Sequence, residues 1–250
     1  MLSAAELQSY CDRLLATEEF DDFCPNGLQV AGERPIRYLI SGVTASLALI
    51  EAAAAQEADA ILVHHGWFWK GESPRLVGIK GHRIRALFRS GMSLLAYHLP
   101  LDAHPEIGNN RSLGEKLGFR SMEATKAGGG LLWKGMLATP LTGRALARQI
   151  GTRLDRMPLH IEVREEPIAS IAWCTGAAQH LIEEAAAQGV QAYLSGEIAE
   201  QTVHQARELG LDYFAAGHHA TERYGVQRLG ERIAAAFEIR HSFLDLDNPA

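Results

Sequence analysis

The chain has 250 residues, of which 47% are hydrophobic and 22% are charged, and its formal net charge is −6. The apolar fraction is large enough for a packed core, which excludes a disordered chain. The acidic balance argues against a protein that binds nucleic acid through a basic surface.

Helix and strand patterns alternate along the chain, which predicts an α/β fold. Ser3 and Glu6 have the S-x-x-E spacing of a capping box, so the first helix is expected to begin there. A short helix is expected to open at Ser112 and to end at Gly118, and Thr142 is expected to cap a later helix. In chain order we predict helices over residues 2–15, 44–56 and 82–88, and strands over 37–43, 58–63, 92–98, 131–138 and 159–163.

An internal repeat relates the two halves of the chain. A shift of 132 residues aligns 39–60 with 171–192 without a gap, and LIEAAAAQ (49–56) differs from LIEEAAAQ (181–188) at one position. Apolar strands flank both copies, so we expect a duplicated βαβ unit and two α/β lobes. The glycine run at 128–130 predicts a hinge. It divides the chain into a first lobe over 1–127 and a second lobe over 128–250, with a C-terminal strand that returns to the first lobe.

Cysteine usage and hydropathy indicate the compartment. Cys11, Cys24 and Cys174 form no CxxC pair, so they provide neither a disulfide framework nor a thiolate zinc site. No run of 18 apolar residues is present to span a membrane. The first residues lack the basic and apolar regions of a signal peptide. We therefore expect a cytoplasmic protein without a membrane partner.

Histidines and acidic residues gather just after predicted strands, at the ends where open α/β sheets build binding sites. If a helix covers residue 220 onward, His218 and Glu222 lie on one face and direct their side chains to one point. Adjacent histidines such as His64 and His65 leave a strand on opposite sides and can reach two ions, which Asp102 or Glu222 can bridge. The clustered residues are, in chain order, His64, His65, His98, Asp102, His104, His218, His219 and Glu222.

Ligation by imidazole and carboxylate without thiolate is typical of Zn, Mn, Fe or Mg. Paired ions that share an activated water support hydrolysis. His98 is equally explained as a hydrogen-bond partner that orients a ligand, and His104 and His219 are weaker candidates. Glu197 lies in the part of the second copy that corresponds to His64 and His65. It can approach the site, or it can form a salt bridge or a helix cap.

The aromatic run WFWK (67–70) directly follows the two adjacent histidines. It can form an aromatic and cationic edge that contacts a heterocyclic or phosphorylated ligand, or it can pack between lobes or subunits. The chain has no G-x-S-x-G elbow for Ser/His/Asp catalysis and no phosphate-binding glycine motif of the P-loop or dinucleotide kind. Nucleotide binding of the P-loop type is therefore not expected.

Four motifs resemble the Nif-three-like family, whose members are described as GTP cyclohydrolase 1 type 2 homologs or dinuclear metal-centre hexameric proteins. The motifs are VHHGWFWKGESP (63–74), YHLPLDAHPEIGNN (97–110), SGEIAEQTVHQARE (195–208) and AAGHHATERYGV (215–226). The resemblance extends from CPNGLQV (24–30) to FLDLDNPA (243–250) and is that of the short bacterial form. It implies two similar α/β lobes with a two-metal site between them, and a toroidal homohexamer. The metal-binding pattern of the family falls on His64, His65, Asp102, His218 and Glu222.

The resemblance implies a metal-dependent hydrolase of a nucleotide-like, heterocyclic or phosphorylated small molecule, with GTP as the candidate substrate. The expected nucleophile is a water bound by two divalent ions, and no catalytic side chain is assigned beyond a place for His98 near the metals. Two other interpretations stay open. One is a different metallohydrolase, such as a phosphoesterase or an amidohydrolase. The other is a non-catalytic metal-binding scaffold or metallochaperone.

Overall fold

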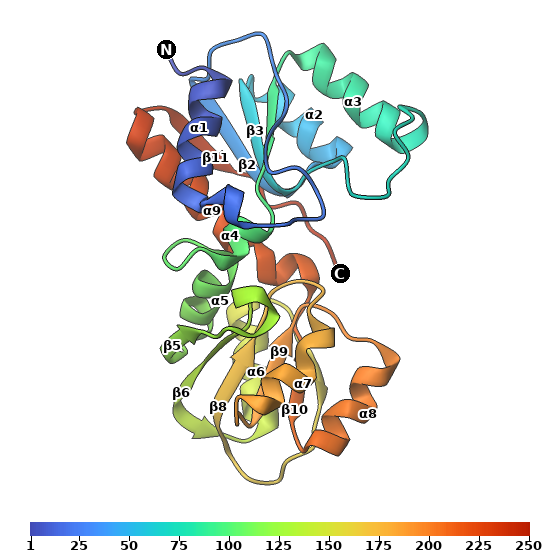
Figure 1. The fold of residues 1–250 in the computed structure, drawn as a ribbon, viewed down its shortest axis with the longest axis vertical. Helices are drawn as coiled ribbons and strands as arrows, with labels where there is room; N and C mark the ends of the chain where they lie inside the picture. Colours follow the sequence, from blue (N-terminus) through green and yellow to red (C-terminus); the bar gives the residue numbers. More distant parts are fainter. The chain divides into compact units, whose positions relative to one another are not determined.

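The computed structural model describes residues 1–250 as a mixed α/β protein with nine α-helices and eleven strands in two sheets. The chain forms two compact units, each with its own sheet (Figure 1). Unit 1 contains residues 1–101 and 225–247, and unit 2 contains residues 102–224 and 248–250. None of the helices is long and apolar enough to cross a membrane.

Unit 1 contains a five-stranded sheet in the order β1-β4-β3-β2-β11. β1 is antiparallel to β4, and the other neighbours are parallel. Its strands are β1 (Gly27–Val30), β2 (Tyr38–Thr44), β3 (Ala60–His65), β4 (Ser93–Ala96) and β11 (Arg240–Phe243). Its helices are α1 (Ala4–Leu15), η1 (Thr17–Glu19), α2 (Leu47–Ala55) and α3 (Gly78–Ser90). The chain passes between the units within α4 (Leu99–Ala103) and α9 (His218–Phe237).

Local sequence signals set the helix starts of unit 1. The capping box is confirmed, because the Glu6 N–H donates to Ser3 Oγ and the Ser3 N–H donates to Glu6 Oε2. The hydroxyl of Ser46 accepts from the N–H of Leu49, so α2 begins at Leu47. The predicted start at Thr44 is too early, because Thr44 still belongs to β2 and pairs with His65 of β3.

Helices cover both faces of the unit 1 sheet. In Figure 1, α2 and α3 lie together on one side, and α1 lies on the other side with the C-terminal end of α9. The strands are buried on both faces, as expected for parallel sheets. The face toward α2 and α3 is formed by Ile40, Ile61, Val63, Leu94 and Ala96.

Unit 2 contains a six-stranded sheet in the order β5-β6-β8-β9-β10-β7. β8, β9 and β10 are parallel, and the outer strands β5, β6 and β7 join antiparallel. Its strands are β5 (Arg120–Ala124), β6 (Trp133–Leu141), β7 (Leu159–Ile161), β8 (Ile168–Trp173), β9 (Ala192–Ser195) and β10 (Asp212–Ala215). Its helices are α5 (Asn109–Leu117), η2 (Ala127–Gly130), α6 (Gly143–Leu154), η3 (Gln179–Leu181), α7 (Ile182–Ala187) and α8 (Glu200–Leu209).

Successive side chains of the central unit 2 strands point to opposite faces, as the strand period requires. One face packs against α5 and α6 through Ile171, Trp173, Leu194 and Phe214. The other face packs against α7 and α8 through Ala172, Cys174, Tyr193 and Tyr213. The expected α/β class and its two lobes are therefore confirmed.

The repeat seen in the sequence is a repeat of structure. β2-α2-β3-α3-β4 in unit 1 has the same order and parallel pairing as β8-α7-β9-α8-β10 in unit 2. Asp59 lies just before β3, and its carboxylate accepts from the N–H groups of Arg37 and Tyr38 at the start of β2. The equivalent residue in the second copy is Gln191, whose side-chain oxygen accepts from the N–H groups of Ala169 and Ser170. A shift of 132 residues relates these two N–H groups to those of the first copy. The two copies therefore share the same side-chain to backbone hydrogen bonds between their first two strands.

The structure places the division of the chain away from the glycine run. β5 and β6 pair antiparallel, so the glycines at 128–130 form the connection of a hairpin within unit 2. Their positive φ values of 56°, 66° and 92° suit such a turn. Residues 102–127 thus pack with unit 2, whereas the sequence boundary at 127 assigns them to the first lobe. β11, near the C-terminus, pairs with β2 in unit 1.

The predicted start of the helix at Ser112 is wrong. α5 begins at Asn109 after Gly108, and Ser112 lies inside it with its hydroxyl donating to the carbonyl of Ile107. The helix ends at Gly118, where φ is 73°, as predicted. Thr142 caps α6 through the N–H of Ala145, also as predicted.

Candidate metal centre

Unit 1 brings three imidazole rings together at the carboxyl ends of two adjacent strands. His64 and His65 end β3, and His98 follows β4. One ring nitrogen from each lies within 4.8 Å of the others. The ring centroid of His64 is 4.7 Å from that of His65 and 5.0 Å from that of His98. Parallel pairing of β3 with β4 explains why residues more than thirty positions apart meet here.

Hydrogen bonds fix which ring nitrogen of two of these histidines carries a proton. His64 Nδ1 lies 2.9 Å from the carbonyl oxygen of Tyr97. A carbonyl only accepts, so Nδ1 of His64 donates and Nε2 keeps its lone pair. His98 Nδ1 lies 2.7 Å from Oδ1 of Asp22. Both rings therefore have Nε2 as the nitrogen suited to a cation.

Asp22 is a buried carboxylate with several donors around it. Oδ2 accepts from the Asn26 amide and from the N–H of Leu99, each at 2.9 Å. Burial alone would raise the pKa of Asp22, but the hydrogen bond and charge of His98 and the other donors lower that pKa to about 2. The carboxylate is therefore ionised at neutral pH. The side chain of Asn26 also accepts from the N–H of His98. Asn26 therefore contacts both Asp22 and His98.

Unit 2 brings together the other predicted donors. Carboxylate oxygens of Asp102, in α4, and Glu222, in α9, lie within 4.8 Å of each other. His218 Nε2 is 3.0 Å from Oε2 of Glu222, so the predicted contact across one helical turn is present. The three side chains offer two carboxylates and one imidazole, and both acids are buried.

A second carboxylate contacts His218 from the loop after β9. Oε1 of Glu197 is 2.7 Å from His218 Nδ1. Burial alone would lower the pKa of His218, but the hydrogen bonds and charges of Glu222 and Glu197 outweigh it and raise the pKa to about 9. Two acids therefore hold this ring from its two nitrogens.

Asp102 is held by residues that sequence reasoning did not single out. Its Oδ1 accepts from the amide of Asn109 at 2.8 Å and from the hydroxyl of Thr175 at 3.3 Å. The side-chain amide of Asn110 donates to the backbone carbonyl of Asp102. The side-chain oxygen of Asn110 accepts from the N–H of Thr175. The paired asparagines that end the motif at 97–110 were the available signal, because buried amides have hydrogen-bonding partners.

Gly176 also went unnoticed in the sequence. Its φ is +67°, and a Cβ at this position would lie 2.0 Å from Oε1 of Glu222 and 3.3 Å from Nε2 of His218. The N–H of Gly176 donates to the hydroxyl of Thr221, which donates to the carbonyl of His218. The loop after β8 is thus tied to the first turn of α9, and the absent side chain leaves room for the two ligand groups.

The weaker candidates have structural contacts. His104 Nδ1 accepts from the N–H groups of Glu106 and Ile107, so it stabilises a turn. The N–H of His219 donates to the carbonyl of Ala250. The thiol of Cys24 lies within 4.8 Å of groups on Asp22 and His98, but burial raises its pKa to about 12, so it stays protonated at neutral pH.

The aromatic run divides between core and site. Trp67 is buried, and its indole N–H donates to the carbonyl of Ala45. Trp69 is half-buried, and its ring centroid is 5.1 Å from that of His98 and 6.1 Å from that of His65. Trp67 therefore packs within the core of unit 1 and not between lobes or subunits, and Trp69 is the aromatic side chain beside the histidines.

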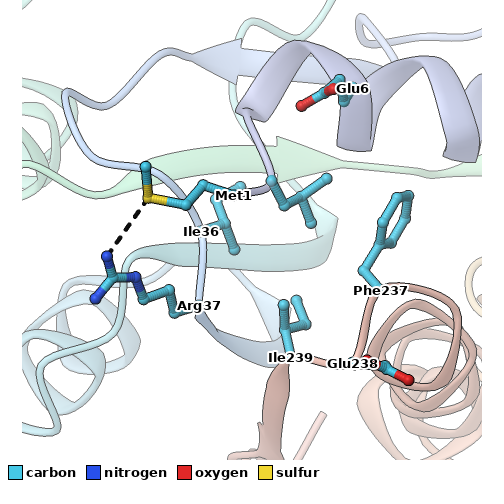
Figure 2. A pocket seen from close by; sticks show the side chains of 8 residues that line it. Met1, Glu6, Ile36, Arg37, Phe237, Glu238 and Ile239 are labelled. Atoms are coloured by element: carbon cyan, nitrogen blue, oxygen red, sulfur yellow. Dashed lines mark hydrogen bonds between the residues drawn. The ribbon is translucent and has the colours of Figure 1, made fainter.

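A separate pocket of about 520 Å³ lies in unit 1 beside the start of the chain (Figure 2). Leu2, Ile36 and Ile239 give it apolar walls, and a guanidinium nitrogen of Arg37 lies 3.5 Å from the sulfur of Met1. None of the candidate metal ligands lines it. This pocket is therefore distinct from the candidate metal centre.

Comparison with known proteins gives matches over the full length. The family described as Duf34/NIF3 (NGG1p interacting factor 3) matches residues 2–249. A protein of Allochromatium vinosum named GTP cyclohydrolase 1 type 2 homolog is 58% identical over 250 residues, covering 100% of this chain and 98% of the relative.

Solved structures agree with this match. A protein described as ybgI, of unknown function, has a TM-score of 0.96 and 43% identity. TTHA1606 from Thermus thermophilus has a TM-score of 0.90 and 31% identity. Both comparisons cover 100% of each chain. The resemblance inferred from the motifs is confirmed, and the chain belongs to the Duf34/NIF3 family.

Proposed function

We propose that the chain binds two divalent metal ions and hydrolyses a nucleotide-like or other small heterocyclic or phosphorylated substrate. The proposed ligands are His64, His65, Asp102, His218 and Glu222. The observation that carries the proposal is the gathering of donors within each unit: three imidazoles in unit 1, and two carboxylates with one imidazole in unit 2.

The chemistry of these donors fits a divalent cation. Imidazole nitrogens and carboxylate oxygens suit Zn, Mn, Fe and Mg, and a second carboxylate allows two ions to share a ligand. The fixed proton on His64 Nδ1 leaves Nε2 as the ligand atom. A bound divalent ion lowers the pKa of water and polarises substrate oxygens, which is the chemistry that hydrolysis needs.

The substrate class rests on Trp69 and on the relatives. An aromatic side chain beside His65 and His98 supports contact with a planar ring of a substrate. Curated relatives that are 44–58% identical are named GTP cyclohydrolase 1 type 2 homolog, which makes GTP the first substrate to test.

We also propose that the chain forms a homohexamer and works in the cytoplasm, as the family resemblance implies. Large apolar side chains at the start of α3 support self-association, because Leu76, Val77 and Ile79 are 52%, 68% and 72% exposed. Light scattering coupled to size-exclusion chromatography measures the number of chains directly.

The test begins with metal content. Elemental mass spectrometry of protein purified without added metal should give about two divalent ions per chain, and metal-loaded protein should turn over GTP or another member of a panel of nucleotides, phosphoesters and cyclic amides. Glu222→Ala should lower the metal content. His204→Ala, which changes an exposed histidine paired with Glu200, should leave it unchanged.

Each outcome has a clear meaning. One ion or none after reloading contradicts the dinuclear site. Two ions without turnover of any panel member contradict the hydrolase and favour a metal-binding scaffold or metallochaperone. Full metal occupancy in the Glu222→Ala variant removes Glu222 from the ligands.

A further inference from the structure

Two histidines of the candidate metal centre share one arrangement. His98 Nδ1 lies 2.7 Å from a carboxylate oxygen of Asp22, and His218 Nδ1 lies 2.7 Å from a carboxylate oxygen of Glu197. In both pairs the carboxylate contacts Nδ1. Nε2 of His218 lies 3.0 Å from Glu222, which is itself a proposed metal ligand. We propose that Asp22 and Glu197 are positioning residues that hold these two rings with Nε2 directed to the candidate metal centre, where His218 is a proposed ligand and His98 lies beside His64 and His65, an inference that rests on the proposed metal centre.

The physical reason is the one-sided chemistry of an ionised carboxylate. It accepts hydrogen bonds and cannot donate them, so it keeps a proton on Nδ1, and a bound cation would take the lone pair of Nε2. It also fixes the plane of the ring and makes Nε2 a stronger donor to a cation. A ring without this partner can rotate and can change tautomer, and both changes weaken metal binding.

The backbone around Glu197 is itself held in place. Its carbonyl accepts from the hydroxyl of Tyr213 at 2.6 Å and from the hydroxyl of Ser195 at 2.8 Å. Both of these side chains are buried in unit 2. The carboxylate of Glu197 therefore extends from a fixed turn, and its hydrogen-bonding partner is His218.

The side chain of Glu197 is expected to contribute little to the stability of the fold. Its side chain is 44% exposed, and an ion pair at such a position contributes little to the free energy of folding. Asp22 differs, because its side chain is 3% exposed and it also accepts from backbone N–H groups. Loss of Glu197 therefore separates positioning from stability, whereas loss of Asp22 affects both.

The chain contains a matched pair outside the site. Glu200 and His204 form an exposed carboxylate–imidazole contact of 3.2 Å on α8, and neither belongs to the proposed ligand set. A second pair outside the site is His160 with Asp212, and Asp212 also accepts from the N–H groups of Val163 and Arg164, just after β7. A carboxylate beside histidine is thus not by itself a sign of metal binding. The role assigned here follows from the place of His98 and His218 among the donors of the candidate metal centre.

The experiment measures Zn²⁺ affinity of the full chain by competition with a chromophoric chelator. Glu197→Ala should weaken affinity about 10- to 100-fold, and Glu197→Gln should recover part of it, because the amide oxygen still accepts from Nδ1. Glu200→Ala should bind as the unsubstituted chain does. The thermal midpoint of metal-free Glu197→Ala should stay within about 2 °C of the unsubstituted chain, as expected for a weak surface pair.

Asp22→Asn tests the other pair. It should also weaken Zn²⁺ binding, and the visible absorption spectrum of the Co²⁺-loaded protein should change in both variants, which a loss of stability alone would not cause. Wild-type affinity in Glu197→Ala, with normal binding by the unsubstituted chain, would overturn this inference and leave the proposed function standing. Failure of the unsubstituted chain to bind Zn²⁺ would overturn both.

Discussion

Replacement of Gly176 by alanine should weaken metal binding at least about tenfold while leaving the fold in place. The added Cβ would lie 2.0 Å from Oε1 of Glu222, and Cβ contacts below 3.0 Å essentially never occur, so the carboxylate must move by about 1 Å. Glu222 is only 3% exposed, which limits where its side chain can go. Because the atom that must move is the end of a flexible side chain, the cost falls on the site rather than on the core.

The size of each effect follows from the backbone and from the displaced ligand. An alanine at φ +67° costs roughly 1–2 kcal/mol of stability. Gly210→Ala is the matched control, since Gly210 also has φ +67° and a Cβ there meets nothing within 4 Å. Both variants should lose similar stability in urea denaturation. Gly176→Ala alone should lose Zn²⁺ affinity, by at least about tenfold, because a ligand that moves by 1 Å is outside productive geometry.

Two results would refute the reasoning. Wild-type Zn²⁺ affinity in Gly176→Ala would mean that Glu222 is not a ligand or that the loop after β8 gives way. An equal loss of affinity in Gly210→Ala would mean that backbone strain, and not the contact with Glu222, weakens the site.

Three further predictions concern stability and are measured by urea denaturation. Burial would raise the pKa of Asp212, but hydrogen bonds led by that from His160 lower it. The contribution of ionised Asp212 to the free energy of unfolding is therefore full above the ordinary carboxyl pKa. It is lost as pH falls through the lowered pKa of Asp212 in the folded protein. Asp212→Asn should cost about 1–3 kcal/mol at pH 7 and less at low pH, and an undiminished cost in acid would contradict this. Ser3→Ala should cost about 1 kcal/mol by removing the capping box with Glu6. Ile61→Ala, in the core of unit 1, should cost about 2–5 kcal/mol, and a loss below 1 kcal/mol would mean that the core closes over the cavity.

The grouping of several candidate donors was predictable from the sequence because they end or follow strands. His64, His65 and His98 come directly after apolar runs, and parallel strands that are neighbours place such residues at one edge of a sheet. The contact of His218 with Glu222 followed from helical spacing alone. Strand ends and helical spacing fix the direction of nearby side chains, so these side chains could be grouped from the sequence alone.

The missed residues act through contacts that no local pattern encodes. Asp22 reaches His98 across 76 positions, and Thr175 reaches Asp102 across 73. The role of Gly176 depends on a side chain that packs against it from α9. The position of the unit boundary has the same origin, because the pairing of β5 with β6 and the packing of α5 against α6 place these elements in unit 2.

Equivalent positions of the two copies of the repeat carry different side chains. In unit 1 the strand equivalent to β9 ends in His64 and His65, whereas the matching positions of unit 2 are Gly196 and Glu197. The equivalent residues are His65 in unit 1, a proposed metal ligand, and Glu197 in unit 2, whose carboxylate contacts the ring of His218. The same place in the fold thus provides a proposed ligand in one copy and a proposed positioning group in the other. Exchange of Glu197 for histidine should therefore not create a further ligand site, and it should weaken Zn²⁺ binding as Glu197→Ala does, because His218 loses its carboxylate partner.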